Sequence, residues 1–496
     1  MITLVDGSTM KVPIVVPGVY GLTQARSQVS NALADLDGVA IVCIAADGVA
    51  GTIYDFSDEG QVTDILGSGI LAADGNAVHA HRLARLCLRV LPHVYVGVVK
   101  VPAVGDSATL DDYKAMIFQM RNVPGIRHII VDNDTAIPAL SQYLNSHFNG
   151  VSAEVMTAGG ANQLKTANAD VVPYTEVIRT GAGALCTRVA ANPVDATHYT
   201  FDYATGTATF GAAADPASTV DYVYPETGEY LDFNRQMGYC GTTAQKTFSE
   251  GQAAAASINA KRMTYCPQRP LDKSGAALTG AYLAATCACL RAIRINPSTR
   301  ERDRTLGING WRVDVFAEFT GIEDFLNQTH ALQYNEWESL INSGCAAFEG
   351  VGNTVEVKRH VTTYTSYLVG GVVTPDLTWQ EPSIVHFDDW DLMDARAEIK
   401  AKYLDGPNGS PANEFTRLAI LTYFVARNKV QSDKGWILLY NPLNPDETAP
   451  KPTVAFHVAD PSIPGDVSDP ARFDVTRKRW AVHPLIAIQI TTELVV

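Results

Sequence analysis

The chain has 496 residues, of which 46% are hydrophobic and 18% are charged, and its formal net charge at pH 7 is −15. A chain of this length is too long for a single hydrophobic core, so we expect two to four domains. The excess of acidic residues argues against nonspecific binding to nucleic acid or to an anionic membrane surface.

The sequence shows no segment that would direct the chain into a membrane. The first residues do not combine a basic start, an apolar run and a small-residue cleavage site, and no apolar run reaches the roughly 18 to 20 residues of a bilayer span. The eight cysteines are scattered without a paired C-x-x-C pattern, which indicates reduced, buried thiols. We expect a cytosolic protein without disulfides and without direct membrane insertion.

The part of the chain before residue 175 alternates between predicted strands and helices. Gly38–Ala46 is a continuous apolar run rich in β-branched residues, which is typical of a central strand covered on both faces. Further strands are predicted at 94–101 and 128–134, and helices at 76–90, 111–120 and 136–148. This order predicts an α/β layer with a mostly parallel sheet.

The pattern changes near residue 175. Thr197–Phe210 alternates aromatic residues with polar ones across a turn, and Thr219–Tyr224 is another strand of period two. Helical periodicity resumes at 252–261 and 275–295. We interpret 176–235 as a small antiparallel β module that is inserted into the α/β layer.

A third region begins near residue 300. A helix closed by Gly344 precedes the alternating strand Asn353–Tyr367. Two longer helices are predicted at 388–404 and 413–428, and the chain ends on the apolar segment His483–Val496. We find no repeat of fixed period.

Motifs of nucleotide-binding and hydrolytic enzymes are missing from the sequence. It contains no G-x-x-x-x-G-K-[ST] loop, no G-x-G-x-x-G after the first strand, no G-x-S-x-G elbow and no H-E-x-x-H pair. His79, His81 and His93 are candidate metal ligands by residue type, but His79 and His81 stand at i and i+2 of a predicted helix and so do not share a face. The same geometry argues against Cys287 and Cys289 as a metal pair.

Two acidic clusters have a catalytic and a structural interpretation. Asp132 and Asp134 follow the third strand, where an α/β sheet would place a metal or a general base. Aspartates in such a position more often cap the next helix. In HFDDWD, residues 386–391, Asp388 or Asp389 is well placed as the N-cap of the following helix. We therefore expect no catalytic residue, no metal and no cofactor.

The C-terminal segment alternates as a strand does. Ile486, Ile488 and Ile490 lie on one face and Leu485 on the other, so one face requires burial and the backbone requires a ladder partner. A free strand of this kind would aggregate. It is either an internal sheet strand or an arm that extends the sheet of a neighbouring subunit.

Two passages resemble one protein family. PGVY, which is Pro17, Gly18, Val19 and Tyr20, precedes an extended segment and then GVAIVCIAADGVAGTIYDFSDEGQVTDILG. This order resembles the N-terminal region of contractile phage tail sheath proteins. The later passage LINSGCAAFEGVGNTVEVKRHVTTYTS resembles the Mu-type pattern of that family more specifically. The two predicted long helices come next, followed by the WILLYNPLNP stretch and then by AVHPLIAIQI, in the order that the family shows.

The resemblance implies a structural subunit and not an enzyme. Copies of the chain would form six-membered rings, stacked helically around a tail tube protein, and would contract to drive the tube through the host envelope. Baseplate and tail terminator proteins would be further partners. The sheath would be assembled in the host cytoplasm and become part of the virion.

The fold implied is α+β and multidomain, with a C-terminal α/β sheath core domain and extended β arms at both ends. The residues of the inter-subunit arms would be Pro17, Gly18, Val19, Tyr20, Leu485, Ile486, Ile488 and Ile490. The expected parts are an N-terminal arm (1–26), an outer α/β domain (27–175 and 236–300), the inserted β module (176–235), an inner core domain (301–475) and a C-terminal β arm (476–496).

Contact with the tube is a separate hypothesis. Arg396, Lys400 and Lys402 of the predicted 388–404 helix are candidates to bind an acidic tube surface, and a solvated helix face is the other interpretation. Two other functions stay open from the sequence. The first is an α/β metal-dependent or hydrolase-like enzyme with a pocket around Asp132 and Asp134, and the second is another self-assembling structural protein.

Overall fold

The computed structural model forms two compact units. The first comprises Met1–Ile293 and Ile308–Gln380, and the second comprises Arg294–Gly307 and Glu381–Val496. The residues that the structure describes are 2–3, 9–10, 38–67, 79–100, 108–144, 146–227, 236–293, 311–312, 319–328, 330–352, 354–369, 371–376, 379–404, 413–433, 437–441, 444–458, 468–477 and 480–481.

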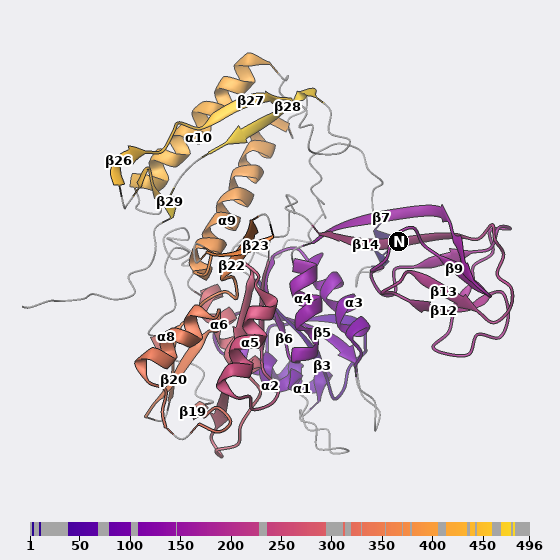
Figure 1. The fold of residues 1–496 in the computed structure, drawn as a ribbon, viewed down its shortest axis with the longest axis horizontal. Coiled ribbons are helices and arrows are strands. Elements are labelled where there is room, and N and C mark those ends of the chain that lie inside the picture. The colour runs from indigo at the N-terminus through magenta and orange to yellow at the C-terminus, as the bar shows by residue number, and fades with distance from the viewer. Residues whose placement is uncertain are drawn as a thin grey trace, which may run out of the picture. The chain divides into compact units, whose positions relative to one another are not determined.

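A six-stranded sheet forms the centre of the first unit (Figure 1). Its spatial order is β16-β15-β6-β3-β5-β4, and every neighbouring pair is parallel except β4 with β5. The mostly parallel sheet and the central place of the first apolar strand are confirmed. The strands are β3 (Gly38–Ile44), β4 (Thr52–Phe56), β5 (Val94–Lys100), β6 (Ile126–Val131), β15 (Met237–Gly241) and β16 (Met263–Cys266).

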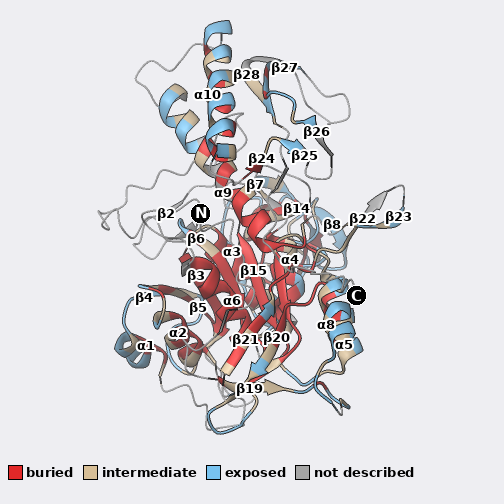
Figure 2. Ribbon diagram, turned by 90° about the vertical axis from the view of Figure 1, so that its left-hand side faces the viewer, coloured by how far each residue is buried: buried red, intermediate tan, exposed pale blue. Residues whose placement is uncertain are grey.

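Helices cover both faces of this sheet. Side chains of β3 alternate between the two cores, because Val39 and Ile41 pack with α2 and α6 while Ala40 and Val42 pack with α3 and α4. Figure 2 shows the central strands and α6 as buried. The helices are α1 (Glu59–Leu66), α2 (Ala80–Leu88), α3 (Leu110–Arg121), α4 (Ile137–Leu144), α5 (Phe248–Ile258) and α6 (Ala281–Ile293); the short η1 (Asp134–Ala136) precedes α4.

The inserted β module is antiparallel for the most part and has its own core. Tyr199, Phe210 and Tyr222 are buried at its centre. Two sheets build it, with the orders β10-β14-β7 and β11-β12-β13-β9-β8. The strands are β7 (Ser146–Val155), β8 (Thr157–Gly160), β9 (Gln163–Lys165), β10 (Val177–Arg179), β11 (Thr187–Arg188), β12 (His198–Asp202), β13 (Thr207–Phe210) and β14 (Thr219–Thr227).

The module begins earlier than the expected boundary at residue 176. β7 starts at Ser146 and pairs with β14 over most of its length, so the predicted helix 136–148 stops at Leu144 and Phe148 lies in a strand. This pairing joins residues far apart in the chain, which local periodicity does not reveal. The predicted hairpin of β12 and β13 is present.

Residues 308–380 belong to the first unit and not to the helices that follow. Phe319, Phe348 and Val355 join the same core as β3, so burial and not chain order sets this division. Gly344 follows α8 with φ 83°, which is the left-handed conformation predicted for a helix-closing glycine. The elements are β17 (Arg269–Asp272), β18 (Trp311–Arg312), β19 (Phe319–Glu323), α8 (Tyr334–Asn342), β20 (Ala347–Val351), β21 (Thr354–Arg359), β22 (Ser366–Val369) and β23 (Val372–Pro375).

The described residues of the second unit form two long helices and short β ribbons. Ala395, Ile420, Phe424 and Val454 form a core where α9, α10 and β27 meet. The ribbons pair β24 with β29, β25 with β26 and β27 with β28, all antiparallel. The elements are α9 (Pro382–Ile399), the π-helical turn η3 (Lys400–Leu404), α10 (Glu414–Asp433), β24 (Ile437–Leu438), β25 (Tyr440–Asn441), β26 (Asn444–Thr448), β27 (Thr453–His457), β28 (Asp469–Thr476) and β29 (Trp480–Ala481).

The prediction that Asp388 or Asp389 caps the helix 388–404 is wrong. The helix begins at Pro382, so both aspartates lie inside it. Proline is favoured in the first turn of a helix because no intrahelical partner is available there for a backbone N–H. At the N-terminus, Ile2–Thr3 (β1) pairs with Thr9–Met10 (β2). Among the described helices, none is both long and apolar enough to cross a bilayer.

Candidate functional site

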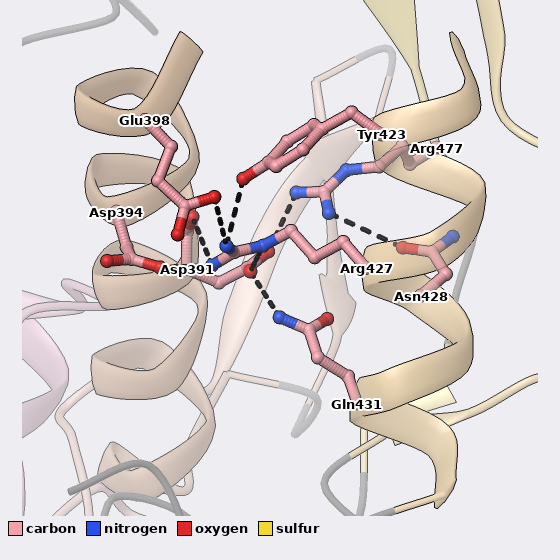
Figure 3. Close-up of polar contacts among 8 residues, drawn as sticks. All are labelled: Asp391, Asp394, Glu398, Tyr423, Arg427, Asn428, Gln431 and Arg477. Atoms are coloured by element: carbon pink, nitrogen blue, oxygen red, sulfur yellow. Dashed lines mark hydrogen bonds and ion pairs between the residues drawn. The ribbon is translucent and has the colours of Figure 1, made fainter. Parts of the chain in front are cut away.

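Within the described residues of the second unit, a cluster of charged side chains is centred on Asp391, in the middle of α9 (Figure 3). Its side chain is fully buried. Oδ1 accepts a hydrogen bond from Arg427 Nε at 2.7 Å and another from the side-chain amide of Gln431. Oδ2 accepts from Arg477 Nη2 at 2.7 Å. One carboxylate therefore joins α9 to α10 and to the end of β28.

Two facing stripes of polar side chains build the rest of the cluster. On α9, Asp391 is followed by Asp394 and Glu398, at i+3 and i+7, which places the three acids on one face of the helix. Arg427 reaches all three, with its Nη2 2.8 Å from Asp394 Oδ2 and its Nη1 3.6 Å from Glu398 Oε2. Arg427 Nη1 also donates to the Tyr423 hydroxyl at 3.0 Å. The stripes hold the helices in one register.

Arg477 extends the cluster to the C-terminal end of the described fold. It follows β28 directly, and only β29 is described after it. Besides its bond to Asp391, Arg477 donates to Asn428 Oδ1 at 3.4 Å, and its guanidinium carbon lies 4.8 Å from the centre of the Phe424 ring. Arg477, shortly before the last described strand, is thus bonded to both helices.

The electrostatics of the cluster favour permanently charged arginines. Burial lowers the pKa of Arg427, and the Asp391 and Asp394 carboxylates beside it raise that pKa. The carboxylates together outweigh burial, so the net shift of the pKa is upward. A buried ion pair is costly to desolvate unless hydrogen bonds satisfy its remaining atoms. Here both oxygens of Asp391 accept hydrogen bonds, which offsets that cost.

The sequence did not predict this cluster, because HFDDWD was interpreted as a helix start with Asp388 or Asp389 as the N-cap. The spacing of the acids at 391, 394 and 398 is a signal that was available. A second signal is the i, i+4, i+8 spacing of Tyr423, Arg427 and Gln431 on the next helix. Two complementary stripes on consecutive helices predict a polar helix–helix contact.

The expected assembly residues are only partly described. Lys400 is half-buried and Lys402 is exposed, and both lie on the π-helical turn after α9. The side chain of Arg396 is outside the described residues, so contact of these three residues with a tube stays a prediction. The expected arm residues also lie outside the described part of the chain: Pro17, Gly18, Val19, Tyr20, Leu485, Ile486, Ile488 and Ile490.

Asp132 and Asp134 have separate structural partners. Asp132 is buried and accepts hydrogen bonds from the Tyr113 hydroxyl at 2.7 Å and from the backbone N–H of Ile44 at 3.0 Å. Burial raises the pKa of Asp132 to about 6, although these hydrogen bonds act in the opposite direction. Asp134 accepts from Thr243 Oγ1 at 2.6 Å. Both carboxylates therefore connect sheet strands to neighbouring segments.

The three histidines considered as ligands also have different partners. His79 bonds to Tyr282, His81 to Thr63 and His93 to Asp55. Within the described ranges, no group of three or more His, Cys, Asp or Glu side chains is arranged to hold a metal ion. The eight cysteines are free thiols, as predicted from the sequence, and seven of them are buried.

Several described surfaces have the chemistry of subunit contacts. In each unit, two-stranded ribbons such as β22–β23 and β27–β28 pair along one edge of each strand within the part of the chain that is described. Such edges can accept a further strand. Large apolar side chains are exposed near them or on α10, with Val372 67% and Phe415 81% exposed. Groups of exposed apolar side chains often mark interaction sites.

Comparison with known proteins gives structural neighbours only. No protein-family model matches the chain, and no curated protein sequence matches it. A chain in the 6-fold symmetrised baseplate of the anti-feeding prophage is 11% identical, with a TM-score of 0.52 over 98% of this chain and 100% of that one. A sheath tail protein of Desulfitobacterium hafniense is 12% identical, with a TM-score of 0.41 over 94% of this chain and 100% of that one.

A sheath tail protein of Listeria innocua is also 12% identical, with a TM-score of 0.40 over 89% of this chain and 94% of that one. The identities are too low to transfer a function, so the likeness concerns the fold. The fold of this chain is shared over nearly its whole length with a chain of the anti-feeding prophage baseplate.

Proposed function

We propose that this chain is the structural subunit of a contractile tail sheath, which polymerises helically around a tail tube and contracts to drive the tube through a host envelope. The observation that carries the proposal is the fold shared, at a TM-score of 0.52, with a chain of a prophage baseplate over nearly the full length of both. The Mu-type pattern at 340–366 favours that branch of the sheath proteins.

The β ribbons support an assembly held together by exchanged strands. A two-stranded ribbon is marginally stable alone and gains from a further strand. The apolar terminal segment at 483–496 has the alternation that such a partner strand requires. An arm of five or six ladder bonds, at about 0.5 to 1.5 kcal/mol each, contributes several kcal/mol before side-chain burial is counted. Repeated in every subunit, this gives a durable lattice.

The proposed mechanism is mechanical. A contact between different surfaces of identical subunits that does not close on itself produces a helix. The helix is assembled in an extended, metastable state, and a trigger at the baseplate lets rigid subunits rotate into a packing of lower energy. The arms keep neighbours connected throughout. The free energy for contraction is stored when subunits are trapped in the extended lattice.

The proposed partners are other copies of the chain in six-membered rings, a tail tube protein, and baseplate and tail terminator proteins. The region from about residue 300 to 475 would lie inward and touch the tube, with Lys402 as an exposed cation available to an acidic tube surface. The α/β layer with its inserted module, residues 27 to 300, would face outward. The assembled protein would be part of a virion tail and would be built in the host cytoplasm.

Negative-stain electron microscopy tests this proposal. The purified full chain is compared with a variant that ends at Pro484, and circular dichroism checks that both are folded. We expect hollow tubes or stacked rings from the full chain and folded monomers from the shortened one. If the full chain stays monomeric with and without a tube protein, the sheath proposal is wrong.

A further inference from the structure

Two contacts of unequal strength hold the segment that precedes the expected C-terminal arm. Within the described residues, β29 comprises Trp480 and Ala481, and it pairs with β24 at Ile437–Leu438. A ladder of two residues holds a segment weakly. Arg477, three residues before β29, has a side chain that is 12% exposed and has partners on two helices. The stronger attachment therefore lies on the side chain and not on the ladder.

The two side-chain oxygens of Asp391 make different connections. Oδ1 accepts hydrogen bonds from Arg427 and Gln431, which are both on α10, so this oxygen joins the two helices. Oδ2 accepts a hydrogen bond from Arg477, so this oxygen joins α9 to the end of β28. Asn428 and Phe424 support Arg477 from α10. The second connection holds the described chain just before β29.

We propose that Asp391 is a positioning residue for the C-terminal arm: through Arg477 it fixes the point and direction from which the last strand departs. A force on that strand is then transmitted to α9 and α10, and it does not break the short ladder between β24 and β29. The mechanical consequence rests on the proposed function, in which the arm joins a neighbouring subunit. The anchoring itself concerns the isolated chain.

A merely stabilising cluster would behave differently under substitution. Arg477→Gln removes the connection to the arm and leaves the bond between Arg427 and Asp391, whereas Arg427→Gln does the reverse. Arg477→Lys keeps the charge but loses the planar fork that reaches both Asp391 and Asn428, so its effect should be intermediate. Lys429→Gln is the matched control, because Lys429 pairs with Asp433 on the exposed face of α10.

The test is hydrogen exchange on the full-length variants. For Arg477→Gln we expect exchange at 437–438 and 480–481 to accelerate about 10- to 100-fold, while the middle of α9 and α10 stays within about twofold of the parent chain. Protease cleavage between 478 and 484 should rise in parallel. For Arg427→Gln we expect the helices to exchange faster as well, and for Lys429→Gln no change.

Two results would overturn the proposal. One is unchanged exchange at both strands in Arg477→Gln, and the other is an equal acceleration over the whole second unit, which would indicate general destabilisation. These readouts do not depend on assembly, so they stand apart from the fate of the sheath proposal. If the parent chain forms tubes, Arg477→Gln should reduce tube formation toward the level of the chain that ends at Pro484, and full assembly would contradict the mechanical role.

Discussion

Asp391 and Arg477 are 86 residues apart in the chain, yet Oδ2 of the aspartate accepts a hydrogen bond of 2.7 Å from the arginine. The Asp391 side chain is fully buried, and that of Arg477 is 12% exposed. Because a buried charge without a partner is strongly unfavourable, this pair ties the last described strands to the middle of a helix.

Removal of that carboxylate should destabilise the second unit strongly. Asp391→Ala removes the fully buried carboxylate from the largely buried guanidinium of Arg477, and it leaves Arg427 with its pairs to Asp394 and Glu398. We expect the free energy of unfolding to fall by about 3 to 5 kcal/mol, measured by urea denaturation followed by tryptophan fluorescence. Lys429→Ala, which breaks an exposed pair, should cost no more than about 0.5 kcal/mol.

A triple variant separates ion pairing from burial in the same region. Replacing Asp391 by Leu together with Arg427 and Arg477 by Met removes all three charges, so no buried charge is left alone. We expect this variant to lose less stability than Asp391→Ala alone. A loss as large as that of the single variant would mean that the hydrogen-bond geometry, and not charge compensation, stabilises the unit.

Gly344 should resist substitution for a steric reason. Its φ of 83° is unfavourable for other residues, and a Cβ built there would lie 2.8 Å from the backbone of Thr363. We expect Gly344→Ala to destabilise the first unit by about 1 to 3 kcal/mol or more. Gly352 also has a positive φ, of 62°, but nothing lies within 4 Å of its Cβ position.

Gly352→Ala is therefore the control for Gly344→Ala. It should cost only the left-handed penalty, about 1 kcal/mol. The difference between the two variants in free energy of unfolding measures the clash with Thr363. Equal losses would show that the contact relaxes and that only backbone conformation matters.

Asp132 should make the stability of the first unit depend on pH. Burial raises its pKa to about 6 from an ordinary value of 3.8, so between these values the folded state binds more protons than the unfolded state. Its contribution to stability is full below the lower value and is lost as the pH rises through the higher one. Relative to Asp132→Asn, the parent chain should lose about 2 kcal/mol between about pH 4.5 and about pH 7.5.

The comparison with Asp132→Asn isolates this group from the buried histidines. Burial lowers the pKa of His79 to about 4, which makes stability rise with pH over much of the same range, but this effect is present in both chains and cancels. Urea denaturation at the two pH values measures the difference. A difference that does not vary with pH would exclude a raised pKa for Asp132.

Neutralisation of the candidate tube contacts should weaken assembly and leave folding intact. We expect the Gln variant of Arg396, Lys400 and Lys402 to form fewer tubes on a tube protein template, because a positive surface facing an acidic partner is lost. The same change at the exposed lysines 165, 273 and 429 removes an equal charge elsewhere and should have little effect. Equal assembly of both variants in moderate salt would reject the contact.

The sequence alone determined the elements whose signal is local. β3 is central because its apolar residues are continuous, and the β12–β13 hairpin is present because aromatic alternation flanks a turn. Gly344 ends a helix because its neighbours have helical spacing and glycine accepts a positive φ. In each case the physical cause lies within a few residues of the effect.

Tertiary structure decided the features that join distant parts of the chain. The pairing of β7 with β14 moved the start of the β module, and a shared core drew residues 308–380 into the first unit. The sequence placed a helix start at Asp388 or Asp389 and gave Asp391 no partner, and only the folded helix pair brings Arg427 and Arg477 to the Asp391 carboxylate. The composition of a segment indicates that a charge will need a partner, but the partner is chosen by packing, because burial makes the unpaired state too costly.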